Sequence, residues 1–283
     1  MHIFYINLDS RPDRRAFMER QAALLGFGME RLRAVTPADI PQAELDYASR
    51  WLGQGELACS HSHRAAWRLI VERNLPAALI LEDDCVLAPQ AAQVLADPDL
   101  MSPGIDMLQF ETHPSRGVLG RPVPTRDSTV TLRRMMSSCL GACAYIMTAR
   151  MARHCIDHPD LPKMDLGKFL FSRNGPGFLY RFRVFQAFPA LATPFGELVP
   201  QEGLSKSDLD QWRDGQRAAA LAKGQPRRRS RWAKLCDNAG HASRALKAFG
   251  LTELLAARHV DIPFAGTEAD ALALLENSPS AAE

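Results

Sequence analysis

The chain of 283 residues has no apolar run near the ~20 residues that a membrane-spanning helix needs. Its opening, Met1 to Leu8, turns polar too soon for a signal peptide. The six cysteines include no Cys-x-x-Cys pair, which argues against a metal or redox role for cysteine. Most of them stand among apolar residues, so we expect buried free thiols. Together these absences favour a cytoplasmic protein.

The composition that remains is that of a globular protein, and its length suits one large α/β domain with or without an appendage. Positive charge gathers between residues 224 and 250, where seven Arg and Lys residues face one acid, Asp237. We therefore expect a domain over residues 1–200 and a helical, basic C-terminal extension over 201–283. A basic segment with aromatic residues at 227–249 suits peripheral contact with an anionic membrane, although a solvated helix face explains it equally well. No nucleic-acid-binding motif is present.

The central feature is the run Ala77-Ala78-Leu79-Ile80-Leu81, followed directly by Glu82-Asp83-Asp84. An unbroken short apolar run predicts a strand buried on both faces of a parallel sheet. If the extended geometry continues, Glu82 and Asp84 point one way and Asp83 the other. Carboxylates at the carboxyl end of such a strand suit Mg²⁺ or Mn²⁺ beside a bound phosphate. A solvated polar turn is an equal alternative on these residues alone.

The chain opens with a strand-turn-helix pattern. His2 to Leu8 reads as a strand, and a helix is predicted from Pro12 to about Leu25, with Gly26 as its stop. A second short strand at 32–35 completes a β-α-β step, which favours a parallel sheet. Arginines at 11, 14 and 15 oppose the helix dipole, which suggests an anionic partner such as a diphosphate. The alternative is a solvated basic face.

A convincing helix is predicted over residues 56–73. His61 and His63 are two positions apart, so they cannot bind one metal together from a helix. Its polar first turn can instead hydrogen-bond a nucleotide or sugar, or serve only in capping and packing. Residues 114–128 look like a long loop.

Two later acids stand near predicted element ends. Glu111 ends a strand candidate, so it can reach the same crevice as the acidic triplet. Asp165 follows a proline-rich turn, where it can either cap the next helix or point into a cleft.

Several of these segments, in this order, resemble the glycosyltransferase family 25 enzymes of lipopolysaccharide synthesis. The resemblance rests on residues 6–15 (INLDSRPDRR), 33–39 (RAVTPAD), 55–63 (GELACSHSH) and 78–84 (ALILEDD), and more weakly on 140–147 and 162–165. It implies a GT-A-like, Rossmann-type α/β domain with a mainly parallel central sheet. It also implies hexose transfer, often of galactose, from a UDP-sugar to a saccharide acceptor such as lipooligosaccharide.

The resemblance further implies an inverting, metal-dependent reaction. Glu82 and Asp84 would then hold Mn²⁺ or Mg²⁺ against the diphosphate, with Asp165 as the first candidate for the base and Glu111 as the second. The remaining donor-binding residues would be Asn7, Leu8, Asp9, Arg11, Arg14, Thr36, Ser60, His61 and Asp83. Within the family pattern, Ser60 and His61 are matched to the Ser-His pair. Two alternatives remain: a protein that binds sugar nucleotides without turnover, and a metal-dependent phosphohydrolase.

Overall fold

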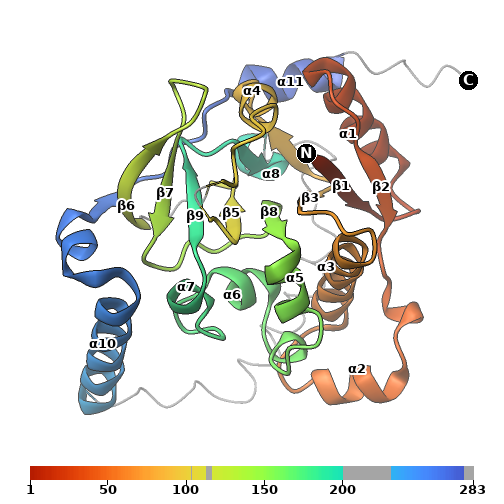
Figure 1. The fold of residues 1–283 in the computed structure, drawn as a ribbon. Coiled ribbons are helices and arrows are strands. Elements are labelled where there is room, and N and C mark those ends of the chain that lie inside the picture. The colour runs from red at the N-terminus through yellow and green to blue at the C-terminus, as the bar shows by residue number, and fades with distance from the viewer. Residues whose placement is uncertain (103, 113–116, 200–230, 277–283) are drawn as a thin grey trace, which may run out of the picture.

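The computed structural model describes residues 1–102, 104–112, 117–199 and 231–276. These residues form a three-layer arrangement in which helices cover both faces of one nine-stranded sheet (Figure 1). The strand order is β11-β6-β7-β9-β5-β8-β3-β1-β2. The predicted α/β class is therefore confirmed.

The N-terminal β-α-β step forms as the sequence predicts. β1 (His2–Asn7) lies between β2 (Glu30–Arg33) and β3 (Ala77–Glu82) and runs parallel to both. α1 (Pro12–Leu25) begins with proline in its first turn and ends at Gly26, which has a left-handed φ of 74°. α3 (Gln54–Glu72) connects this region to β3.

The rest of the sheet is mixed. β8 (Ala144–Thr148) runs antiparallel between β3 and β5 (Met107–Gln109), and β5 pairs in parallel with β9 (Val184–Phe188). β7 (Thr131–Met135) and β6 (Gly117–Pro124) extend the sheet by antiparallel pairing. The expected mainly parallel pairing holds on both sides of β1 and between β5 and β9, and the other strand pairs are antiparallel.

β6 occupies residues 117–124 of the loop predicted at 114–128, and residues 114–116 lie outside the described residues. Pro122 and Pro124 of this strand donate no ladder hydrogen bond. The register with β7 shifts between Leu119 and Pro122, and this irregularity accommodates the proline-containing half of the strand.

The two faces of β3 lie in different cores, which explains its unbroken apolar sequence. Leu79 and Leu81 pack with α1, α4 (Gln90–Leu95), α8 (Phe195–Leu198) and α11 (Glu268–Glu276). Ala78 and Ile80 pack with α3, α5 (Ala149–Cys155), α6 (Leu166–Phe171) and α7 (Phe178–Arg181). All four side chains are fully buried.

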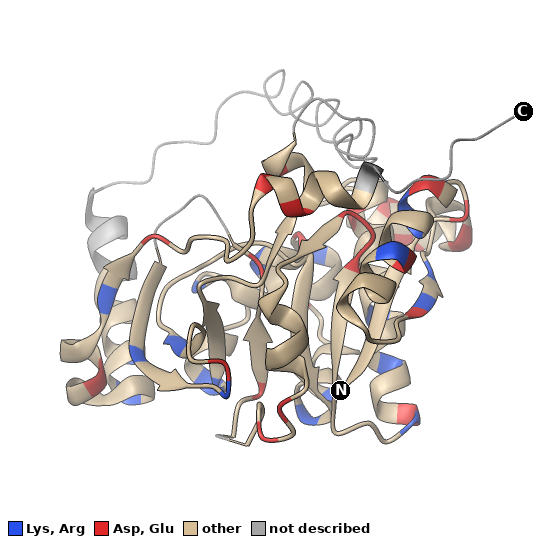
Figure 2. Cartoon of the chain, turned by 90° about the horizontal axis from the view of Figure 1, so that it is seen from above, with Lys and Arg blue, Asp and Glu red and all other residues tan. Residues whose placement is uncertain are grey.

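Smaller elements complete the fold. α2 (Gln42–Ala48) and the short 3₁₀ turn Pro37–Asp39 stand beside α3, and a second 3₁₀ turn spans Leu161–Lys163. β4 (Cys85–Leu87) and β10 (Ala192–Pro194) form a separate antiparallel pair. Charged residues lie mainly on the helices and connecting segments, while the central strands are largely uncharged (Figure 2).

The described part of the C-terminal segment returns to the sheet. α10 (Arg231–Ala256) is interrupted at Gly250 (φ 76°), and β11 (Arg258–Val260) then adds to β6 as an antiparallel edge strand. Arg20 of α1 donates to the carbonyl of Leu274 in α11 at 2.7 Å. Arg227 to Arg229 of the predicted basic segment lie outside the described residues. Among the helices that the structure describes, none combines the length and apolarity of a membrane span.

Candidate functional site

A cavity of about 180 Å³ opens beside the carboxyl ends of β1 and β3. Ile6 of β1 is in register with Glu82, the last residue of β3, so the ends of the two strands meet. The walls come from these strand ends, the start of α1, the segment after β2 and the first half of α3. The lining residues are Ile6, Leu8, Arg14, Ala34, Val35, Thr36, Pro37, Gly55, Ala58, Cys59, Ser62, His63, Glu82, Asp83 and Asp84.

Arg14 is the buried cation of this site, with 5% of its surface exposed. Its Nη1 donates to Asp83 Oδ1 at 2.8 Å and lies 3.3 Å from Asp84 Oδ2. Asn7 Nδ2 donates to the other oxygen of Asp83 at 2.7 Å. A buried carboxylate needs such partners, so the arginine of the first helix and the acids after β3 stabilise one another.

The expected alternation of the acidic triplet is wrong. β3 ends at Glu82 and the chain turns at Asp83-Asp84 into β4, so the period of two does not extend past the strand. As a result Asp83 and Asp84 share Arg14, while Glu82 Oε1 lies 3.4 Å from His63 Nε2.

Burial raises the pKa of Asp84 to about 7; Arg14 opposes this shift, and the charges of Glu82 and Asp83 add to it. Glu111 belongs to the same group of acids. Burial raises its pKa to about 8, and the charges of Glu82 and Asp84 contribute in the same direction. Its Oε2 accepts the backbone N–H of Cys143 at 2.7 Å. Repulsion among these acids favours a bound proton or cation at the site.

Gly141 provides the space that Glu111 occupies. A Cβ at this position would lie 2.4 Å from Glu111 Oε1, and the φ of 127° is one that glycine adopts readily. Gly141 therefore allows the buried carboxyl to lie against the segment before β8.

One set of three potential metal ligands occurs in the described part of the chain: Cys59, His63 and Glu82, whose ligand atoms lie within 4.8 Å of one another. Cys59 and His63 are one helical turn apart on α3, a spacing that could have been recognised from the sequence. Sequence reasoning paired Glu82 with Asp84 and assigned no metal role to cysteine. The structure adds a thiol and an imidazole beside Glu82.

The first Ser-His pair of α3 does not face this cavity. Ser60 Oγ donates to the carbonyl of Glu56, and His61 Nε2 lies 2.9 Å from Glu44 in a separate hollow. Ser62 accepts the backbone N–H of Val35 at 2.8 Å and lines the cavity with His63. Ser60 and His61, which we predicted to bind the donor, therefore line no part of this cavity, because helix packing turns Ser62 and His63 towards the sheet.

The other predicted donor residues divide into two groups. Leu8 and Thr36 line the cavity, whereas Asp9 is exposed and pairs with Arg31 and Arg33. Arg11 pairs with Asp13 at 2.8 Å. Sequence reasoning missed Arg31, whose Nε donates to the side chain of Asn7 at 2.8 Å and so helps to orient the amide that holds Asp83.

Asp165 acts as the N-cap of α6. Its carboxylate accepts the backbone N–H of Lys168 at 3.0 Å and pairs with the ammonium of the same residue. It lies outside the cavity lining, although α6 passes close to the acids: a Cβ on Gly167 would lie 2.9 Å from the backbone nitrogen of Gly141. Gly167 of α6 and Glu111 thus approach Gly141 from two elements, while Asp165 lies beside Gly167.

Comparison with known proteins places residues 1–162 in the family described as Glycosyltransferase family 25 (LPS biosynthesis protein). A "Glycosyltransferase 25 family member" of Drosophila pseudoobscura pseudoobscura is 31% identical over 40% of this chain, but the match spans only 22% of that relative. "Procollagen galactosyltransferase 2" of Homo sapiens is 34% identical over 29% of this chain and 15% of its own length.

A bacterial relative matches over more of this chain and over most of its own length. "Lacto-N-neotetraose biosynthesis glycosyltransferase LgtE" of Neisseria gonorrhoeae is 24% identical over 74% of this chain and 80% of its own length. The family match covers more than half of the sequence, including every element that forms the acidic cavity. The chain belongs to glycosyltransferase family 25.

Proposed function

We propose that this protein transfers a hexosyl group from a UDP-sugar to a saccharide acceptor of lipopolysaccharide or lipooligosaccharide. The observation that carries this proposal is the buried Arg14, which lines a cavity where the ends of β1 and β3 meet and is held there by Asp83 and Asp84. The carboxyl ends of parallel strands are where α/β sheets bind ligands. Family membership and the names of LgtE and procollagen galactosyltransferase 2 support glycosyl transfer, with galactose as the first donor to test.

In this proposal one part of the donor enters the cavity of about 180 Å³ between β1, β3 and α3, and the rest extends beyond it. Leu8 and Thr36 flank the nucleotide, while Arg14 faces the diphosphate from the start of α1. A guanidinium supplies paired donors that match phosphate oxygens. Asn7 and Asp83 position Arg14 through their hydrogen bonds.

A divalent cation fits the same acids. Asp84 Oδ1 is buried and has no hydrogen-bond partner among the described residues, and Glu82 lines the cavity next to it. We propose that Glu82 and Asp84 would hold Mn²⁺ or Mg²⁺, for which carboxylate oxygens are suitable ligands. The ion would neutralise charge on the departing UDP. Cys59 and His63 form a softer set with Glu82, which favours zinc-type ions if they bind metal instead.

An inverting reaction needs a base that removes the proton of the acceptor hydroxyl. Glu111 adjoins the acids and has a pKa raised to about 8 by burial, so it is largely protonated at neutral pH. Asp165 is more exposed but is engaged with Lys168. We propose these two carboxyl groups as candidates, to be separated by Glu111→Gln and Asp165→Asn variants in a transfer assay.

The test is a panel of UDP-sugars with Mn²⁺, measured with and without lipooligosaccharide. Release of UDP only when acceptor is present supports transfer. Phosphate release without acceptor would instead indicate a hydrolase, and binding without turnover would indicate a sugar-nucleotide-binding protein. Asp84→Asn should abolish transfer while the protein remains folded; near-normal turnover in this variant would exclude the metal assignment.

A further inference from the structure

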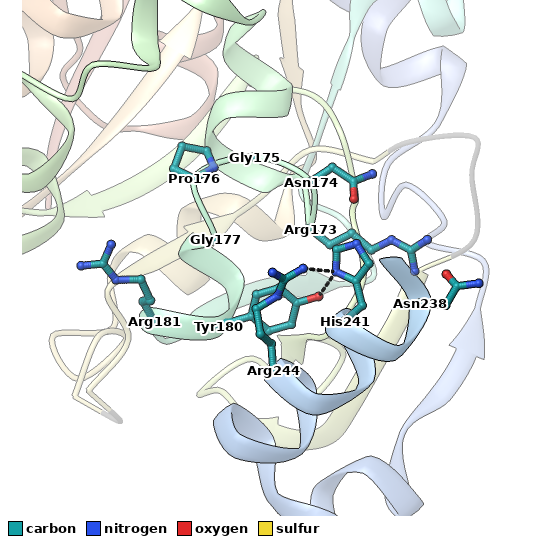
Figure 3. Close-up of a pocket in the computed structure, with 10 residues that line it drawn as sticks. All are labelled: Arg173, Asn174, Gly175, Pro176, Gly177, Tyr180, Arg181, Asn238, His241 and Arg244. Carbon is teal, nitrogen blue, oxygen red and sulfur yellow. Dashed lines mark hydrogen bonds between the residues drawn. The ribbon is translucent and has the colours of Figure 1, made fainter. Parts of the chain in front are cut away.

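A second cavity, of about 850 Å³, lies between α7, the segment before it and α10 (Figure 3). Ligand pockets for small molecules have volumes of about 300–1,000 Å³. Three arginines contribute to its lining, and no Asp or Glu does so among the described residues. The lining residues are Arg173, Asn174, Gly175, Pro176, Gly177, Tyr180, Arg181, Asn238, His241 and Arg244.

One wall of this cavity is built by contacts between distant parts of the chain. Tyr180 Oη and Arg244 Nη2 each lie 3.0 Å from His241 Nδ1, as the dashed lines in Figure 3 show. A guanidinium only donates hydrogen bonds, so Nδ1 accepts and carries no proton. The arginine is therefore held by a neutral ring, and no carboxylate neutralises its charge in these contacts.

α10 is fixed against the domain at this wall. Phe249 is buried, and the guanidinium of Arg134 from β7 lies 4.7 Å from the centre of its ring. Tyr180 packs 6.0 Å from the same ring. These contacts hold Arg244 opposite the segment that carries Arg173, so that the two cations converge on one hollow.

The cavity is connected to the acidic site by α6. Gly167 of this helix lies against Gly141, which adjoins Glu111, and the chain reaches Arg173 two residues after the helix ends. Six helical residues span about 9 Å. The acids and the arginine-lined cavity thus lie towards opposite ends of one short helix.

We propose that the cavity between α7 and α10 binds a phosphate group carried by the saccharide acceptor, and so positions that acceptor for transfer. This inference rests on the proposed glycosyltransferase function. Guanidinium groups form paired, charge-assisted hydrogen bonds with phosphate. The amides of Asn174 and Asn238 supply donors and acceptors for neighbouring sugar hydroxyls.

Direct binding tests the site without turnover. The probes are a phosphorylated oligosaccharide and the same oligosaccharide after phosphatase treatment, titrated by calorimetry. We expect Arg173→Gln and Arg244→Gln each to weaken binding of the phosphorylated probe by about tenfold or more. Arg153→Gln, an exposed arginine of α5 outside the lining, should bind like the parent protein. Equal affinity in all three variants, or for both probes, would overturn the proposal.

Kinetics and vesicles distinguish the remaining outcomes. If transfer occurs, Arg244→Gln should raise KM for the phosphorylated acceptor while kcat and KM for the UDP-sugar stay unchanged. A different outcome is that the parent protein binds phosphatidylglycerol vesicles but not the oligosaccharide, and that the arginine variants lose vesicle binding. That outcome would assign the site to a lipid headgroup and refute the acceptor role. Arginine-dependent binding of the oligosaccharide in a protein that turns over no UDP-sugar would refute the proposed function but retain the phosphate site.

Discussion

The guanidinium of Arg14 touches the buried carboxylate of Asp83 and the partly buried carboxylate of Asp84, so its loss should cost stability. Arg14→Met leaves both carboxylates without this cation. Removal of one partner from a buried pair costs about 3–5 kcal/mol. Urea denaturation should show this loss, whereas Arg15→Met, which removes an exposed pair with Glu19, should leave the midpoint unchanged. A midpoint for Arg14→Met equal to that of the parent would contradict the network.

The raised pKa values of Asp84 and Glu111, about 7 and about 8, predict a pH dependence of stability. Both exceed the ordinary values of 3.8 and 4.5, so the folded state binds more protons between these limits. The stability that these groups contribute is complete below about pH 4 and is lost as pH rises through 7 and 8. The slope reaches about 1.4 kcal/mol per pH unit for each group.

Glu111→Gln isolates one of these two groups. We expect a smaller fall in stability between pH 5.5 and 8.5 than in the parent, because a neutral amide no longer ionises in the buried site. Unfolding in urea at three pH values measures the slope. Glu72→Gln, at an exposed position of α3, is the matched control and should follow the parent curve. Identical slopes for all three proteins would exclude Glu111 as the titrating group.

At the scale of elements, the orientation of α3 decides which of its two histidines lines the acidic cavity. His63→Asn should reduce kcat/KM for the UDP-sugar by about tenfold or more, the effect of removing a hydrogen-bonding group next to substrate. His61→Asn changes only the contact with Glu44 and should stay within about twofold of the parent. If His61→Asn instead reduced activity more than His63→Asn, the donor would be assigned to the first Ser-His pair, Ser60 and His61.

The strand and helix boundaries near the site were largely predictable from local chemistry. Pro12 and Gly26 mark the ends of α1, and the apolar run of β3 reflects burial on two faces. The sequence also allowed a prediction of which Ser-His pair faces the sheet, because His63 lies on the same helical face as Trp67 and Ile70, which are fully buried. The geometry of Asp83 and Asp84 could not be predicted from local sequence, because it depends on Arg14, which stands 69 positions before Asp83.

At the scale of the whole molecule, the C-terminal segment supports the sheet. Ile262, beyond β11, is 4% exposed and packs in the same core as α3 and α5. Ile262→Ala should therefore cost about 2–5 kcal/mol by leaving a cavity. Leu255→Ala, at a side chain 71% exposed, should have little effect on the same denaturation curve. Equal, small effects would indicate that residues 201–283 behave as an independent extension.

The mixed sheet was only partly predictable. The predicted β-α-β step favoured parallel strands, and parallel pairing occurs among β1, β2 and β3. The insertion of β8 between β3 and β5 involves residues more than sixty positions after β3, and no local pattern specifies which earlier strands it joins.

This insertion has a consequence for synthesis on the ribosome. Until residues 144–148 emerge, the edge of β3 that will pair with β8 has no partner strand. The 62 residues from Glu82 to Ala144 take roughly 3–12 s to make at about 5–20 residues per second. During that interval an apolar Ala-Ala-Leu-Ile-Leu edge can associate with other nascent chains. The strand that leads into the acids of the site is thus also a segment whose edge stays unpaired while the chain is being made.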